Sequence, residues 1–186
     1  MREHFDRATR PLRLALCTLL CAAAIVAFIW SEAHAQSVRI VALGASNTAG
    51  YGVGRSAAWP ARLEALLRAR GVAAAVANAG ISGNSSRDLL ARLDRSVPAG
   101  TRLVILEASG FNDRRKGQQG EFRANVAKIK ARLAARKVGV LQLSRSMVAG
   151  ALGRRHLQGD GIHLTSKGQA IYAAKILPHV LAALKR

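Results

Sequence analysis

Residues 39–54 (RIVALGASNTAGYGVG) indicate how the whole chain is organised. Residues 39–43 are mostly apolar, as in a buried β-strand, and Gly44 breaks the pattern. Ser46 follows in a tight turn that is rich in Gly, Ala and Asn. Because an open α/β sheet places its chemistry at the carboxyl ends of its strands, Ser46 is a candidate nucleophile. The alternative is an ordinary turn serine, whose hydroxyl bonds only the local backbone.

Residues 1–35 have the pattern of a secretory signal peptide. Four arginines are followed by an apolar run over residues 14–30 and by Ala33-His34-Ala35, which is typical of a cleavage site. We therefore expect cleavage after Ala35 and a single domain, residues 36–186, that is periplasmic or secreted. An uncleaved anchor is the alternative, because the apolar run is long for a signal peptide and slightly short for a membrane span.

The cysteine content and the net charge of the chain indicate which kinds of partner the domain can bind. Both cysteines, Cys17 and Cys21, lie in the signal segment, so the domain itself has no disulfide. The chain carries a net charge of +19, and residues 1–35 contribute only +1 of it, from four arginines and three acids, which leaves +18. Such a charge favours anionic membrane or glycan surfaces. It is scattered through every predicted helix without interleaved aromatic residues or zinc-finger spacing, which argues against a nucleic-acid partner.

Strand and helix patterns alternate along the domain. The predicted strands cover residues 39–43, 72–78, 102–107 and 138–143, and the predicted helices cover residues 59–70, 87–93, 121–136 and 166–184. Ser85 and Asp88 form a candidate capping box for the second helix. Residues 144–159 have no strong period and predict a loop or a short helix. The alternation predicts an α/β fold with right-handed crossovers and a parallel sheet.

Four loops carry the glycines and polar residues expected of a site: residues 44–48, 81–84, 110–113 and 160–163. The first three follow predicted strands, and the carboxyl ends of parallel strands share one edge of the sheet. The fourth loop precedes the last helix and can reach the same edge. We therefore expect all four to meet.

These loops contain every group that acyl transfer by a serine needs, with no metal or cofactor. Ser46 is the predicted nucleophile and His163 its general base. Asp160, three residues before His163, can accept the Nδ1 proton and orient the ring. The backbone N–H groups of Ser46 and Gly83, with the side-chain amide of Asn112, are the predicted oxyanion hole.

Each of these residues also has a structural interpretation. Asp160 and Gly83 can serve only their turns, and Asn112 can cap its own loop. Asp113 is expected to brace the third loop rather than to act as a base. The other histidines have no comparable partners and are expected at the surface or in the processed segment: His34, His156 and His179.

In this order the loops resemble the sequence blocks of the SGNH hydrolases, also called GDSL hydrolases. Residues 44–48 (GASNT) are similar to the first block, 78–83 (NAGISG) to the second, 110–113 (GFND) to the third and 160–163 (DGIH) to the fifth. The resemblance implies a three-layer α/β/α flavodoxin-like fold with four to five parallel strands. It also implies hydrolysis of esters or thioesters. Residues 50–53 with Trp59-Pro60 look most like the periplasmic thioesterase, lysophospholipase and arylesterase branch.

The chain departs from the family pattern in two places. Family members usually have Asp where this chain has Ala45, which puts the rigidity of the nucleophile turn in question. Only about 50 residues separate Asn112 from His163, which is room for one helix and one strand. The spacing therefore predicts a compact member without a fifth strand and with a more open cleft.

The sequence as a whole predicts an exported, monomeric serine esterase that forms an acyl-enzyme on Ser46. The expected substrates are carboxylic esters or thioesters with small to medium acyl groups, including aryl esters and lysophospholipids. Two alternatives stay open, a deacetylase of cell-envelope polysaccharide and a non-catalytic protein that binds anionic envelope polymer. Residues 114–116 (RRK) either form a solvated turn or attract anionic headgroups to the site.

Overall fold

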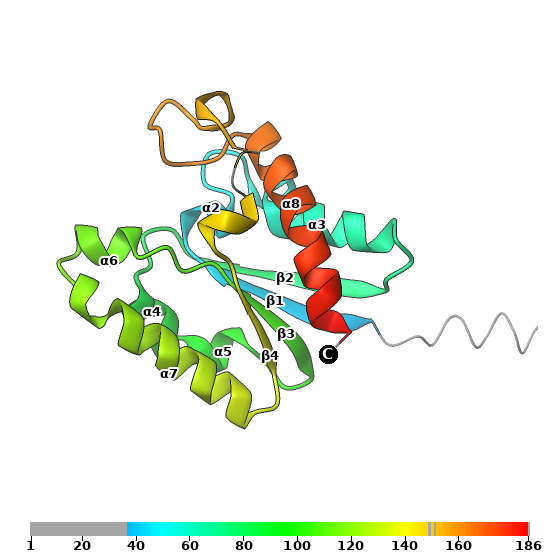
Figure 1. The fold of residues 1–186 in the computed structure, drawn as a ribbon, viewed down its shortest axis with the longest axis horizontal. Helices are drawn as coiled ribbons and strands as arrows, with labels where there is room; N and C mark the ends of the chain where they lie inside the picture. The colour runs from blue at the N-terminus through cyan, green and yellow to red at the C-terminus, as the bar shows by residue number, and fades with distance from the viewer. Residues whose placement is uncertain (1–36, 149, 151, 186) are drawn as a thin grey trace, which may run out of the picture. The chain divides into compact units, whose positions relative to one another are not determined.

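The computed structural model describes residues 37–148, 150 and 152–185, and its centre is a parallel sheet (Figure 1). The strands are β1 (Val38–Gly44), β2 (Ala74–Gly80), β3 (Thr101–Leu106) and β4 (Gly139–Gln142), in the order β2-β1-β3-β4. This is the flavodoxin-like strand order, in which β2 is added on one side of β1, and β3 and β4 on the other, so that the order of the strands reverses between β1 and β3. The predicted signal segment and its cleavage site lie outside the described residues.

The central strand β1 is buried on both faces, as its apolar sequence predicts. Ile40 and Ala42 point to one face of the sheet, and Val41 and Leu43 point to the other. All four side chains are fully buried. Successive residues of a strand face opposite sides, so this one strand contributes to both hydrophobic cores.

Helices α3 (Trp59–Arg68) and α8 (Ser166–Leu184) cover one face of the sheet. Pro60 lies in the first turn of α3, where its missing N–H has no helical partner to lose. Leu63 and Leu67 from α3 pack with Ile176 and Val180 from α8 against the Ile40 face. These contacts bury the apolar stripe that the sequence pattern predicted for each helix.

The opposite face is covered by α4 (Ser86–Ala91), α5 (Leu93–Ser96) and α7 (Phe122–Ala135), with α6 (Phe111–Arg115) at the edge (Figure 1). Leu89 from α4 and Ile129 and Leu133 from α7 pack against the Val41 face. The predicted capping box of α4 is present, since the Asp88 carboxylate accepts a hydrogen bond from the Ser85 N–H at 2.8 Å. The α/β fold with helices on both sides of a parallel sheet is confirmed.

Two 3₁₀ helices, Arg145–Val148 and Arg154–His156, occupy the connection between β4 and α8. An isolated antiparallel bridge joins Leu157 to Leu164 near its end. Within the described residues the sheet has four strands, the smaller of the two numbers predicted. None of the described helices is both long enough and apolar enough to cross a membrane.

His156 corrects one expectation, because it is buried rather than at the surface, with 3% of its area exposed. Its Nδ1 accepts from the Gly153 N–H at 3.1 Å, and its carbonyl accepts from the Thr165 N–H at 2.9 Å. His156 thus holds Thr165, the N-cap residue of α8, in place. The contact joins residues nine positions apart, so local sequence patterns do not predict it. His179 is exposed as expected, and His34 lies outside the described residues.

A one-turn helix, α2 (Ser46–Ala49), follows β1 and lies on the ends of β1 and β2. A Cβ atom placed on Gly44 would lie 2.1 Å from Thr48 Oγ1, and one placed on Gly80 would lie 2.2 Å from the Ala49 nitrogen. Only glycine allows so close an approach. The packing therefore fixes the height of Ser46 above the sheet.

We expect Gly80→Ala to lower the free energy of unfolding by about 1–3 kcal/mol, because the added methyl group forces β2 away from α2. Urea denaturation followed by circular dichroism measures the change. Gly120→Ala is the control, since a Cβ atom there meets nothing within 4 Å, and it should change stability by less than about 0.5 kcal/mol. Equal effects of the two substitutions would contradict the tight packing.

Candidate active site

Ser46 is the first residue of α2 and lies at the carboxyl edge of the sheet, as predicted. Its carbonyl accepts hydrogen bonds from the N–H groups of Gly50 and Tyr51, each at 3.0 Å. Gly50 adopts a φ of 82°, which ends the helix after a single turn. Ser46 is therefore held in a short, tightly closed turn, and its own side chain is partly exposed.

Glu107, the residue after β3, braces this turn. Its Oε2 accepts hydrogen bonds from the Ala45 N–H at 3.3 Å and from Thr48 Oγ1 at 3.1 Å. Burial raises the pKa of Glu107, while these two hydrogen bonds act in the opposite direction. A carboxyl group from β3 thus contacts the turn in which Ala45 replaces the usual Asp, and the turn is braced without an acid at position 45.

Asp160 and His163 form the predicted pair. The His163 Nδ1 lies 2.5 Å from Asp160 Oδ2, and Asp160 Oδ1 accepts from the N–H groups of Ile162 at 2.9 Å and His163 at 3.0 Å. The backbone hydrogen bond from His163, its side-chain bond and the Ile162 bond together lower the pKa of Asp160 to about 2. The carboxylate is thus ionised at neutral pH and oriented toward Nδ1, which leaves Nε2 of His163 available as a base.

Asn47 links the nucleophile turn to the histidine loop. Its Oδ1 accepts from the Leu164 N–H at 2.9 Å, and its carbonyl accepts from Gln169 Nε2 at 3.0 Å. Asn47 follows Ser46 directly and Leu164 follows His163 directly. The contact therefore joins the two residues that directly follow the predicted nucleophile and the predicted base. The described residues show no hydrogen bond between Ser46 Oγ and His163. Such bonds are often long before substrate binds.

Gln158 and Tyr51 add a second link between the same two loops. Gln158 Nε2 donates to the carbonyls of Tyr51 at 2.8 Å and Leu164 at 2.9 Å. The Tyr51 ring lies against the His163 ring, with 4.3 Å between the centroids. We call Asn47, Gln158 and Gln169 the amide clasp, because their three side-chain amides hold the histidine loop on the nucleophile turn.

The two remaining oxyanion-hole candidates, Gly83 and Asn112, lie in loops that a hydrogen bond joins. Gly83 adopts a φ of 79°, a conformation that favours glycine. Asn112 Nδ2 donates to the Asn84 carbonyl at 2.9 Å, which joins the third loop to the second. This hydrogen bond goes to another loop, so it is not the cap on its own loop that was the structural alternative for Asn112. Its amide has a second N–H group that can donate elsewhere.

Residues 42–154 match the GDSL-like lipase/acylhydrolase family, over more than half of the chain. The chain belongs to this family of ester hydrolases. The matched residues include the loops of Ser46, Gly83 and Asn112 and end before Asp160 and His163. The predicted SGNH/GDSL family is therefore confirmed, and the acid–base pair rests on the geometry of the structure.

Known members of the family resemble the chain in sequence and in fold. An arylesterase from Vibrio mimicus is 32% identical over 93 residues, 50% of this chain and 46% of the relative, so the chain spans about half the length of that curated relative. The crystal structure of AlinE4, an SGNH-hydrolase family esterase, is 27% identical with a TM-score of 0.60, over 80% of this chain and 97% of AlinE4. The crystal structure of TesA superposes with a TM-score of 0.70 at 24% identity, over 78% of this chain and 99% of TesA, and shows the same three-layer fold.

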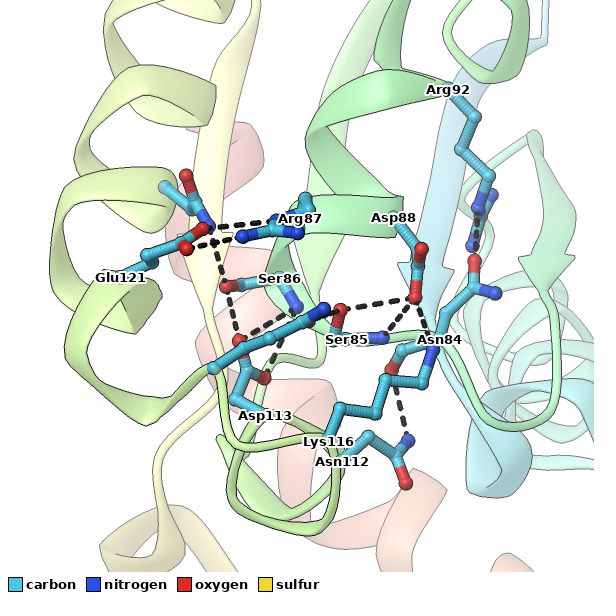
Figure 2. Close-up of polar contacts among 12 residues, drawn as sticks. Asn84, Ser85, Ser86, Arg87, Asp88, Arg92, Asn112, Asp113, Lys116 and Glu121 are labelled. Atoms are coloured by element: carbon cyan, nitrogen blue, oxygen red, sulfur yellow. Dashed lines mark hydrogen bonds and ion pairs between the residues drawn. The ribbon is translucent and has the colours of Figure 1, made fainter.

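Asp113 is buried, with 2% exposed, and braces the third loop as predicted. Both of its carboxylate oxygens accept from the Ser86 N–H at 3.1 Å, and one of them also accepts from the Ser86 hydroxyl. Ser86 Oγ in turn accepts from Asn125 Nδ2 on α7 at 3.1 Å (Figure 2). This buried network fixes α6, and with it Asn112, to the start of α4.

The basic residues 114–116, after the third loop, do not all make the same kind of contact. Lys116 Nζ lies 2.6 Å from Asp88 Oδ2, so it pairs with the capping carboxylate of α4. Arg114 and Arg115 are exposed, each with its guanidinium 5.9 Å from the centre of the Phe111 ring. Among the described residues, neither of these two arginines pairs with an acidic side chain.

A cavity of about 400 Å³ opens at the ends of β3 and β4. Glu107, which contacts the nucleophile turn, lines it, but Ser46, Gly83, Asn112 and His163 do not. Its lining mixes apolar and polar side chains from the segments that follow β3 and β4 and from α7 and α8, among them Glu107, Ser109, Phe122, Leu143, Arg145 and Tyr172. Arg145 comes from the loop that the sequence left without a pattern. Within the described residues, no three His, Cys, Asp or Glu side chains lie close enough to hold a metal ion together.

Sequence reasoning missed the residues that connect the loops. Gln169 is fully buried, and its Oε1 accepts from the Trp59 N–H at 2.9 Å while its Nε2 donates to Asn47. The sequence feature that could have indicated this role is a glutamine on the inward face of an otherwise apolar helix. Glu107 gave a similar signal, because it is a carboxylate directly after the most apolar strand.

We expect the Asp160 carboxyl group to titrate near pH 2 in carbon-detected NMR, well below the usual 3.8. Because its pKa is lower in the folded state, ionised Asp160 stabilises the fold fully above about pH 4 and loses this effect as the pH falls through its folded pKa. His163→Ala should raise the midpoint only part of the way, since the two backbone donors remain. A wild-type midpoint near 3.8 would contradict these hydrogen bonds.

Proposed function

We propose that the chain is a serine esterase, exported to the periplasm or beyond, that hydrolyses carboxylic esters through an acyl-enzyme on Ser46. The carrying observation is the Asp160–His163 pair, whose atoms lie 2.5 Å apart and whose loop is held on the nucleophile turn by Asn47. A nucleophile, a base and an orienting acid on adjacent loops are the parts that acyl transfer requires.

The reaction follows from these positions. His163 Nε2 takes the proton of Ser46 Oγ as the oxygen attacks the carbonyl carbon of the ester, and the carbonyl oxygen becomes the oxyanion. The N–H groups of Ser46 and Gly83 and the amide of Asn112 stabilise this charge. When the tetrahedral intermediate collapses, protonated His163 gives its proton to the departing alcohol or thiol. Water then attacks the acyl-enzyme by the same steps and releases the acid.

The cavity that shares Glu107 with the nucleophile turn supports esters or thioesters with a small to medium acyl or aryl group. About 400 Å³ is at the lower end of the volumes found for small-molecule sites. Phe122, Leu143 and Tyr172 give the lining an apolar part. The Vibrio mimicus relative is an arylesterase and AlinE4 is an esterase, which adds support for an aryl or alkyl ester.

The exposed apolar residues support amphiphilic substrates such as lysophospholipids. In the described part of the chain, the exposed large hydrophobic residues are Tyr51, Ile81 and Ile162, with 51%, 47% and 38% of their areas exposed. Ile81 and Ile162 lie on the second and fourth loops, and Tyr51 directly follows the nucleophile turn. Together we call them the apolar rim. A monomer with this rim and a strongly basic surface would meet anionic membranes with its active site. Arg114 and Arg115, in α6, directly follow the loop of Asn112.

We expect Ser46→Ala to abolish hydrolysis of nitrophenyl esters and labelling by a fluorophosphonate probe, because both reactions require the serine oxygen. His163→Ala should lower kcat by about 10³-fold or more, since the remaining donors still bind the oxyanion. Ser166→Ala is the matched control, because this hydroxyl accepts from Arg62 on the outer surface, and it should leave both readouts unchanged.

A wild-type protein that neither labels nor hydrolyses any ester of the series would refute the enzyme and favour the binding protein. Release of acetate from acetylated xylan or peptidoglycan, without turnover of longer esters, would favour the polysaccharide deacetylase instead. The acyl-length profile of the same series gives the preferred substrate.

We expect the double substitution Ile81→Ser with Ile162→Ser to raise KM for a long-chain lysophospholipid about five- to tenfold, because the pair loses about 1–1.4 kcal/mol of apolar contact in total. The same variant should hydrolyse nitrophenyl acetate with an unchanged KM, which serves as the internal control. Tyr51 is left intact because it contacts the His163 ring. Equal changes in KM for both substrates would contradict a role of the rim in lipid binding.

A further inference from the structure

Arg92 is a buried arginine that the proposed reaction does not use. It joins α4 to α5, and only 3% of its area is exposed. Figure 2 shows its side chain extending from α4 to Asn84, next to the loop of Gly83. Arginine is rarely buried so fully unless it is paired with an acid.

The guanidinium ties together the ends of two neighbouring strands. Its Nη2 donates to the carbonyl of Gly44, the last residue of β1, at 2.9 Å and to that of Ala79 in β2 at 2.8 Å. Its Nε donates to Asn84 Oδ1 at 2.7 Å, and its Nη1 donates to Ser96 Oγ at 3.0 Å. The fixed fork of donors in a guanidinium suits this arrangement, which a lysine cannot reproduce.

These contacts reach all three candidate donors of the oxyanion hole. Gly44 lies two residues before Ser46. Asn84 follows Gly83 directly, and its carbonyl accepts the Asn112 amide at 2.9 Å. One side chain thus connects the segments that position the Ser46 N–H, the Gly83 N–H and the Asn112 side chain.

The peptide group between Gly44 and Ala45 is held at both ends. Its carbonyl accepts from Arg92, and its N–H donates to Glu107 Oε2 at 3.3 Å. The orientation of this peptide group sets the direction in which the chain enters Ser46. A rotation here would turn the Ser46 N–H away from the reacting carbonyl.

The charge of Arg92 has no acidic partner among the described ion pairs, and all four of its hydrogen-bond partners are neutral groups. Burial lowers the pKa of Arg92, but an arginine side chain stays protonated in proteins. The nearby Asp88 carboxylate is already bonded to Ser85 and Lys116. A buried positive charge with neutral partners is destabilising, unless an anion forms nearby.

We propose that Arg92 is the positioning residue of the oxyanion hole, which it assembles from three loops and supplies with a buried positive charge that favours the anionic transition state. The inference rests on the proposed esterase function and goes beyond it, since Arg92 touches neither the nucleophile nor the base. A role limited to folding would change stability without changing the preference for a tetrahedral anion.

The test compares Arg92→Met and Arg92→Lys with Arg95→Met, a matched control because Arg95 is exposed three residues further on. Each variant is assayed for kcat and KM on a nitrophenyl ester and for inhibition by an arylboronic acid, which binds as a tetrahedral anion on the serine. Arg92→Met should lower kcat about 10–100-fold with KM nearly unchanged, and weaken boronate binding by a similar factor. Arg92→Lys should recover part of both, and Arg95→Met should match the wild type.

Asn84→Ala gives a second, milder variant that removes only the Arg92 Nε contact. It should lower kcat and boronate affinity about three- to tenfold, and the double variant with Arg92→Met should be no worse than Arg92→Met alone. The proposal is overturned if folded Arg92→Met keeps wild-type kcat or boronate affinity, or, where Arg92→Met does not fold, if Asn84→Ala keeps both. A wild-type protein inactive on every ester refutes the esterase function itself, and the role of Arg92 with it.

Discussion

The contact of α2 with the ends of β1 and β2 is the constraint on which the site depends. Gly44 and Gly80 have no Cβ atoms, so the one-turn helix lies directly on the sheet. β1 in turn cannot shift, because its side chains are locked into the hydrophobic cores on both faces. The buried strand β1 thus determines where Ser46 lies. The other three loops are arranged around Ser46.

Two buried side chains of opposite type hold the peptide group before Ser46. Glu107 reaches its N–H from the end of β3, and Arg92 reaches its carbonyl from the end of α4. Ala45 cannot contribute a side-chain hydrogen bond, and it need not do so. The turn lacks the Asp that family members usually have at position 45. Glu107 and Arg92, which lie 62 and 47 positions after Ala45 in the chain, hold its backbone instead.

Local patterns in the sequence were sufficient where the structure is determined locally. Apolar runs identified the strands, the spacing of Ser85 and Asp88 identified a cap, and the three-residue spacing of Asp160 and His163 identified a hydrogen-bonded pair. β2 began two residues later than predicted, because its pairing with β1 starts at Ala74 rather than where its apolar run begins.

The missed residues act over long separations. Asn47 contacts residues 117 and 122 positions away, and Glu107 contacts the nucleophile turn from 62 positions away. Neither periodicity nor capping rules report such contacts, because they depend on how the strands are ordered in the sheet. His156 was misplaced for the same reason, since its burial follows from packing at the start of α8.

The short connection between β4 and α8 explains why the amide clasp matters. Without a further strand among the described residues to support it, the histidine loop takes its support from the nucleophile turn, through Asn47, and from Gln158. The loop of His163 is therefore fixed to the same unit as the turn of Ser46. Arg145, which lines the cavity, is the first residue of the first 3₁₀ helix, at the opposite end of this connection from His163. Sequence changes around Arg145 can reshape the cavity without altering the contacts that hold His163 beside Ser46.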